Sequence, residues 1–201
     1  MLDGLGRWIS EVIAGYGYPG ITALMLLENL FPPIPSEIVL PLTGFFVGRE
    51  DLSFFPALVA ATAGSVAGAM VLYSLGRWGG RPLVLRYGAI LRVKEKDLDR
   101  AESWFDRYDE FVVLFARLVP FARSVVSIPA GTLRMPIWKF LLLTAIGSAA
   151  WNSLLIGAGW YLGETWERVG AVVGPISEAV VVLAAGATVF LAIRWWRSRR
   201  R

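Results

Sequence analysis

The chain has 201 residues, of which 56% are hydrophobic and only 18% are charged, and its mean hydropathy is +0.56. Soluble domains are about 45–50% apolar with about 25% charged residues, so this composition excludes a disordered chain and argues against a water-soluble globule. The sequence holds no Cys and no His, which excludes disulfides, thiolate or histidine metal sites and Ser–His hydrolases. What remains is one integral membrane domain, expected to use neither a metal nor a cofactor.

The two ends of the chain indicate its orientation. The basic tail at residues 194–201 follows an apolar segment and favours the anionic cytoplasmic leaflet over nucleic acid, so we predict a multi-pass protein of the cell inner (plasma) membrane with a cytoplasmic C-terminus. The N-terminus has no basic region ahead of an apolar core, so no secretory signal is expected. Apolar residues recur at helical spacing over residues 2–13 and predict an amphipathic helix in the membrane interface.

Three stretches are apolar and long enough to cross a membrane. At 1.5 Å per residue, each is longer than a hydrocarbon core of about 30 Å. The predicted transmembrane helices are residues 54–76, 138–163 and 170–193. Between the first two, residues 77–110 carry charges of both signs opposite an apolar face, which predicts an amphipathic cytoplasmic segment.

Two further apolar stretches, residues 14–48 and 111–135, are interrupted by proline and do not fit a simple span. Proline breaks helical hydrogen bonding, and non-helical backbone is tolerated at membrane depth only where protein or a wet cavity surrounds it. Each stretch therefore predicts a re-entrant hairpin, which enters and leaves the membrane on the same side. The prolines expected to break the hairpins are Pro33, Pro35, Pro120 and Pro129.

The predicted topology has a two-fold pattern. With the C-terminus in the cytoplasm, the first hairpin and its span enter from outside, while the second hairpin and its span enter from inside. The predicted fold class is an all-α membrane protein in which a re-entrant hairpin plus transmembrane helix is repeated with inverted topology. Interfacial helices and a C-terminal transmembrane helix complete it. This arrangement is common in secondary transporters.

Apart from Arg134 at the cytoplasmic end of the second hairpin, four charged side chains lie inside the predicted hairpins: Glu28 and Glu37 in the first, and Arg117 and Arg123 in the second. Left unpaired in a bilayer, they would together cost on the order of 10 kcal/mol, so we expect them to face protein, water or one another. One interpretation is structural, with two buried ion pairs that hold the hairpins together. The other is a functional site, because buried ion pairs stabilise a protein poorly compared with apolar packing.

Arginine in such a site favours a phosphate ligand, because its planar guanidinium grips phosphate with two hydrogen bonds and stays charged when partly dehydrated. Carboxylates add a proton that can be taken up and released. The pattern predicts an anion, phosphate, bound by Arg117 and Arg123 near the membrane midplane, with Glu28 and Glu37 as ion-pairing and proton-exchanging groups.

A polar pair in the second predicted span is a candidate for an auxiliary role. Asn152 lies beside Trp151, inside an otherwise apolar stretch. The amide could cap a hairpin or contact a head group, and hydrogen bonding between helices is the alternative.

The runs ENLFPPIPSEIVLPLTGFF (28–46) and FARLVPFARSVVSIPAGTLRMPIWKF (115–140), with GSAAWN at 147–152, resemble the DedA family, also called the VTT or SNARE-associated domain family. The resemblance covers essentially the whole chain. It implies that the family's essential acidic pair falls on Glu28 and Glu37 and its essential arginines on Arg117 and Arg123. It also implies movement of lipids between leaflets, with undecaprenyl phosphate and phosphatidylethanolamine as proposed substrates, and in some members a dependence on the proton gradient.

We therefore expect a proton-coupled flippase for a phosphate-bearing lipid, without enzymatic activity. Undecaprenyl phosphate is the leading candidate substrate. The alternatives are a phosphatidylethanolamine flippase or non-selective phospholipid scramblase, and a proton or small-ion transporter or scaffold. An enzyme acting on lipid phosphates normally needs a nucleophile with a base, or metal ions, and two glutamates are a thin ligand set. The expected partners are protons and either membrane phospholipid or polyprenyl phosphate, and no nucleic acid. The oligomeric state is left open, with a homo-oligomer as one alternative.

Overall fold

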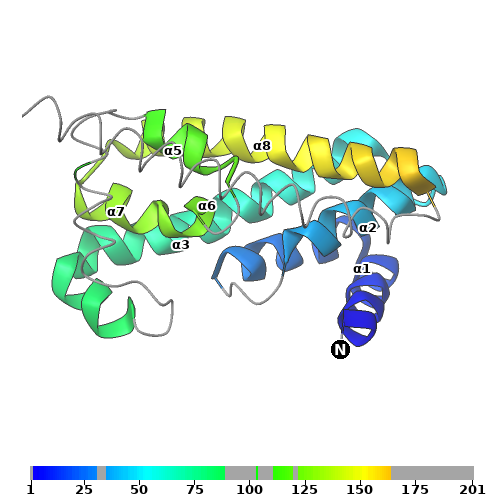
Figure 1. Ribbon diagram of the computed structural model, residues 1–201, viewed down its shortest axis with the longest axis horizontal. Coiled ribbons are helices and arrows are strands. Elements are labelled where there is room, and N and C mark those ends of the chain that lie inside the picture. Colours follow the sequence, from blue (N-terminus) through cyan, green and yellow to red (C-terminus); the bar gives the residue numbers. More distant parts are fainter. Residues whose placement is uncertain (1, 31–34, 89–102, 104–110, 120–121, 164–201) are drawn as a thin grey trace, which may run out of the picture.

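A computed structural model describes residues 2–30, 35–88, 103, 111–119 and 122–163 (Figure 1). Within these residues every regular element is helical, which confirms the predicted all-α class for this part of the chain. The predicted span 170–193, the basic tail 194–201 and most of the predicted cytoplasmic segment 77–110 lie outside the described residues.

The first helix, α1 (Leu2–Leu30), is broken at Gly17, whose φ of 56° and ψ of −132° are not helical. Only glycine adopts this left-handed φ without steric cost, so the break falls at Gly17 and not after residue 13, where the sequence predicted the interfacial helix to end. Figure 1 shows the part of α1 before the break turned away from the direction of the long helices. The helix α2 (Ser36–Gly48) follows.

Two long apolar helices form the centre of the fold. They are α3 (Phe54–Gly88), with a break at Gly80, and α8 (Ile137–Leu162). The stretches Phe54–Gly80 and Ile137–Leu162 are long and apolar enough to cross a membrane. Helix α3 begins at the predicted residue but continues past residue 76, so the predicted cytoplasmic segment starts inside this helix. The two long helices run in opposite directions along the molecule (Figure 1).

Three short helices lie between α3 and α8 in the chain: α5 (Phe111–Ala116), α6 (Ala122–Val125) and α7 (Ser127–Thr132). Pro129 lies in the first turn of α7, directly after the break between α6 and α7, and without an N–H it cannot bond the carbonyl oxygen of Val125, the last residue of α6. Pro35 precedes α2 directly in an extended conformation. The other two predicted breakers, Pro33 and Pro120, lie outside the described residues.

The short helices pack on the long ones in an exchanged pattern. Helices α1 and α5 each contact the long helix that follows them in the chain, α3 and α8 respectively, whereas α2 packs on α8 and α7 packs on α3. Glycines permit close contact in the two exchanged pairs. A Cβ atom on Gly44 would lie 2.1 Å from the carbonyl oxygen of Ile156, and one on Gly131 would lie 2.1 Å from that of Tyr73. No side chain fits at either contact, so the helix backbones touch.

Candidate functional site

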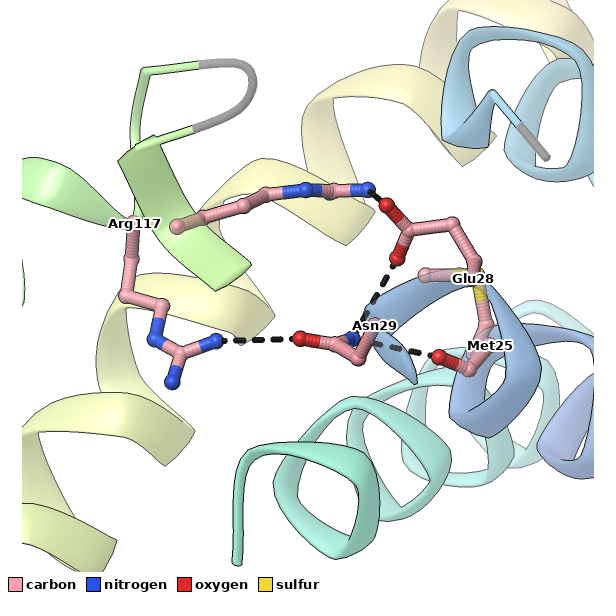
Figure 2. A network of polar contacts seen from close by, with 5 residues as sticks. Met25, Glu28, Asn29 and Arg117 are labelled. Atoms are coloured by element: carbon pink, nitrogen blue, oxygen red, sulfur yellow. Dashed lines mark hydrogen bonds and ion pairs between the residues drawn. The ribbon is translucent and has the colours of Figure 1, made fainter. Parts of the chain in front are cut away.

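Two of the predicted charged residues form an ion pair inside the molecule. Arg123 on α6 donates from Nη2 to Oε1 of Glu28, which lies in the last turn of α1 (Figure 2). The side chains of Arg123 and Glu28 are only 8% and 7% exposed. The pair therefore links the segment before α3 to the segment before α8, away from solvent.

Arg117, which follows α5 directly, is held in a different way. Its Nη1 donates to Oδ1 of Asn29 at 3.3 Å and its Nη2 donates to Oγ of Ser127 at 2.8 Å, while its Nε is buried without an acceptor. The guanidinium also lies 5.9 Å from the ring centroid of Phe140. Among the described residues no carboxylate forms an ion pair with Arg117, so its polar contacts are with neutral groups.

Asn29 connects the two charged centres, as Figure 2 shows. Its Nδ2 donates to Oε2 of Glu28 at 3.2 Å and to the carbonyl oxygen of Met25 at 3.1 Å, while its Oδ1 accepts from Arg117. Neither Asn29 nor Ser127 was predicted from the sequence as a site residue. The available signal for Asn29 was a second polar side chain beside Glu28 in an apolar run.

Glu37 does not join this network. It lies half-buried in the first turn of α2, where a negative charge is favoured by the helix dipole. No hydrogen bond or ion pair reaches its carboxylate within the described part of the chain. Of the two ion pairs that the structural interpretation requires, the described residues therefore form one, because Asn29 and Ser127 take the place of a second carboxylate beside Arg117.

The predicted auxiliary residues lie on α8 and share no hydrogen bond with these charges. Asn152 is fully buried, and its Nδ2 donates to Oγ1 of Thr62 on α3 at 3.3 Å. Its Oδ1 and the Nε1 of Trp151 are buried without partners. The contact with Thr62 favours hydrogen bonding between helices over a head-group contact for Asn152.

The surroundings of Arg117 are closely packed. The ring of Phe140 stacks on Tyr73 with centroids 4.6 Å apart, and the hydroxyl of Tyr73 donates to the carbonyl oxygen of Met135 and accepts from Arg77 at 2.7 Å. These contacts hold α3 against α8, on the face of α8 where the guanidinium lies. The site is thus a desolvated cluster in which two guanidinium groups accompany one buried carboxylate, a charge balance suited to an anion.

The family model for the VTT domain matches residues 34–161. The chain belongs to this family, the DedA family. The match includes both arginines of the site, whereas Glu28 and Asn29 lie just ahead of it. Family membership and the two long apolar helices make this a membrane protein.

Several curated relatives cover nearly the whole VTT-domain chain. It is 38% identical over 180 residues, 87% of this chain and 84% of the relative, to the alkaline phosphatase-like protein of Lactococcus lactis subsp. cremoris (strain MG1363). It is 36% identical over 183 residues, 90% of both chains, to undecaprenyl phosphate transporter A of Bacillus subtilis (strain 168). It is 33% identical over 197 residues, 96% of this chain and 97% of the relative, to undecaprenyl phosphate transporter A of Staphylococcus aureus (strain NCTC 8325 / PS 47). No solved structure matches the chain.

Proposed function

We propose that this protein is a proton-coupled flippase that moves a phosphate-bearing lipid between the leaflets of the inner membrane, with undecaprenyl phosphate as the leading candidate substrate. The observation that carries the proposal is the buried network in which Glu28 and Asn29 of one segment meet Arg117 and Arg123 of another. Two relatives that cover at least nine-tenths of the chain are named undecaprenyl phosphate transporter A, and their names support the same substrate.

The proposed architecture is the inverted repeat of two re-entrant hairpins, with the C-terminus in the cytoplasm. The first hairpin comprises the second part of α1 together with α2, and the second comprises α5, α6 and α7. The opposite directions of α3 and α8 support this arrangement, and so does the exchanged packing of α2 on α8 and α7 on α3. In such repeats, substrates bind near the midplane, where the two halves meet.

In the proposed cycle, protonation of Glu28 weakens its bond with Arg123 and frees this guanidinium for the phosphate. Release of the phosphate at the other leaflet, followed by loss of the proton, restores the pair. A proton gradient then gives the cycle a direction, because it sets how often Glu28 is protonated from each side. Glu37, half-buried at the start of α2, is the second candidate for proton exchange in this proposal.

The structure represents a closed state in this scheme. Glu28 and Arg123 are each 6% exposed and Arg117 is 1% exposed, so a phosphate group reaches them only after the surrounding helices move. The prenyl chain stays in the surrounding lipid throughout the cycle. Only the charged head group then needs a path through protein, and its charge is balanced there by arginine.

The test is lipid movement in proteoliposomes that hold labelled undecaprenyl phosphate. The proposal predicts movement with the unmodified protein and none with Glu28→Gln or Arg123→Ala, provided that each variant elutes as folded protein in detergent. Movement that survives both substitutions would contradict it. Assaying released phosphate in the same vesicles tests the phosphatase activity suggested by the name of the Lactococcus relative.

A further inference from the structure

The two buried arginines differ in what holds them. Arg123 is bonded to the carboxylate of Glu28, so this pair carries no net charge while Glu28 is ionised. Within the described residues, the hydrogen bonds of the Arg117 guanidinium go to two neutral acceptors, Oδ1 of Asn29 and Oγ of Ser127. Its positive charge is therefore the uncompensated one among the described residues of the site.

Arg117 also retains an unused donor. Its Nε is buried and has no acceptor, although the residue is 1% exposed and water is therefore excluded. A buried donor without a partner is unfavourable, and a buried cation without a counter-ion is more so. An oxyanion that approaches the Nε edge of this guanidinium would supply both the acceptor and the negative charge.

We propose that Arg117 is the resident phosphate-binding group of the site, and that Arg123 joins it only after Glu28 has released it. In this proposal Asn29 and Ser127 are positioning residues that hold the Arg117 guanidinium without neutralising it. The inference rests on the proposed function, since it assigns separate roles to the two arginines of the same phosphate site. It predicts that the Glu28–Arg123 pair contributes nothing to the first encounter with phosphate.

Asn29 is suited to this task because an amide can serve both charges at once. It donates to the carboxylate of Glu28 and accepts from Arg117. An aspartate of the same shape at position 29 would place a carboxylate against Arg117 and compete with the phosphate. Asn29→Asp keeps the shape of the side chain but replaces the neutral amide with a carboxylate and loses the donor to Glu28, so it tests whether the neutral amide is required.

The experiment is calorimetric titration of the full-length protein in detergent with farnesyl phosphate, and with farnesol as the uncharged control. Relative to the unmodified protein, Arg117→Gln is expected to bind farnesyl phosphate at least about 50-fold more weakly, because it removes a desolvated charge–phosphate contact. The double variant Glu28→Gln/Arg123→Gln, which removes a neutral pair as a unit, is expected to stay within about threefold. Glu28→Gln alone frees Arg123 and is expected to bind about tenfold more tightly.

The positioning residues give an independent measurement if Arg117→Gln does not fold. Asn29→Asp is expected to weaken binding at least about 30-fold and Ser127→Ala about fivefold. Ser124→Ala is the matched control, because Ser124 is buried on the same segment and forms no hydrogen bond with Arg117 in the described structure. Asn29→Asp that binds as the unmodified protein does would overturn the role given to Asn29.

The results distinguish this inference from the proposed function. If the unmodified protein binds farnesyl phosphate no more tightly than farnesol, the phosphate site itself is wrong and both proposals fail. If it prefers farnesyl phosphate but Glu28→Gln/Arg123→Gln loses as much affinity as Arg117→Gln, both arginines bind the phosphate from the start. In that case only the division of roles is overturned.

Discussion

The carboxylate of Glu28 and the guanidinium of Arg123 form an ion pair in the interior of the protein, although 95 residues separate them along the chain. Glu28 lies at the end of α1, and Arg123 lies on α6. Each belongs to a segment that precedes one of the two long apolar helices. The pair is thus a direct bond between the two halves of the molecule.

Breaking this pair from one side is expected to destabilise the protein more than removing it altogether. Glu28→Gln or Arg123→Gln leaves one buried charge unpaired, which typically costs about 3–5 kcal/mol. The double variant is expected to lose less than the sum of the single variants, by at least about 1 kcal/mol. The measurement is the free energy of unfolding in detergent, followed by circular dichroism, for the unmodified protein, the two single variants and the double variant.

The exposed ion pair between Arg49 and Asp51 is the control for that cycle. Its side chains are 62% and 51% exposed, so Asp51→Asn is expected to change the free energy of unfolding by no more than about 0.5 kcal/mol. Strictly additive effects of Glu28→Gln and Arg123→Gln would show that the buried pair is not coupled energetically.

A glycine on α8 sets the position of Arg117. A Cβ atom on Gly147 would lie 2.7 Å from the Cβ of Arg117 and 3.1 Å from the carbonyl oxygen of Leu114, so Gly147→Ala must displace the end of α5. We expect a loss of about 1–3 kcal/mol in the free energy of unfolding, together with weaker binding of farnesyl phosphate. Gly157→Ala is the control on the same helix, because its Cβ would meet nothing within 4 Å. Equal effects of the two substitutions would contradict the close packing of Arg117 on α8.

The hydroxyl of Tyr73 is expected to stabilise the contact between α3 and the start of α8. Tyr73→Phe keeps the ring stacked on Phe140 but leaves the carbonyl oxygen of Met135 and the Nη1 of Arg77 without this partner. The expected loss is about 1–2 kcal/mol, measured by thermal unfolding in detergent. Tyr161→Phe, at a residue that is 92% exposed, should change stability by less than about 0.5 kcal/mol. If the two variants are equally stable, the Tyr73 hydroxyl does not have the role assigned to it.

The break in α1 depends on the backbone of Gly17. With φ at +56° and no atom within 4 Å of an added Cβ, Gly17→Ala tests conformational strain alone. We expect a loss of about 1–2 kcal/mol, whereas Gly15→Ala, two residues earlier in the same helix, should be neutral or stabilising by up to about 1 kcal/mol. Thermal unfolding of the two variants makes the comparison. A stabilising Gly17→Ala would mean that α1 continues straight through this residue.

Sequence patterns predicted those parts of the structure that depend on local composition or on the large free-energy cost of an unpaired charge in a membrane. The apolar stretches that became α3 and α8 are recognisable because their length and lack of charge are local properties. Convergence of Glu28 with the two arginines was predictable because an isolated charge in a membrane is costly. The exact place of the helix break near Pro129 was not predictable, because the effect of proline depends on its place within a turn, which composition does not reveal.

The partners of each charge were not predictable in the same way. Four charges of balanced sign favour two ion pairs on paper, yet Arg117 is bonded to Asn29 and Ser127 while Glu37 stays outside the network. That choice depends on which side chains the packing of α1, α5 and α7 brings within hydrogen-bonding distance. Small polar side chains such as those of Asn29 and Ser127 give little signal in a sequence until this geometry is known.

The most direct test of the account is lipid movement in proteoliposomes offered labelled undecaprenyl phosphate and labelled phosphatidylethanolamine in parallel, with and without an imposed pH gradient. The account predicts that undecaprenyl phosphate moves, that the gradient accelerates or directs its movement, and that Arg123→Ala abolishes it while phosphatidylethanolamine stays in place. Equal movement of both lipids, unaffected by the gradient, would identify a scramblase and contradict the proton-coupled cycle at Glu28. Absence of movement of either lipid would contradict lipid transport and leave the buried charges with a structural role.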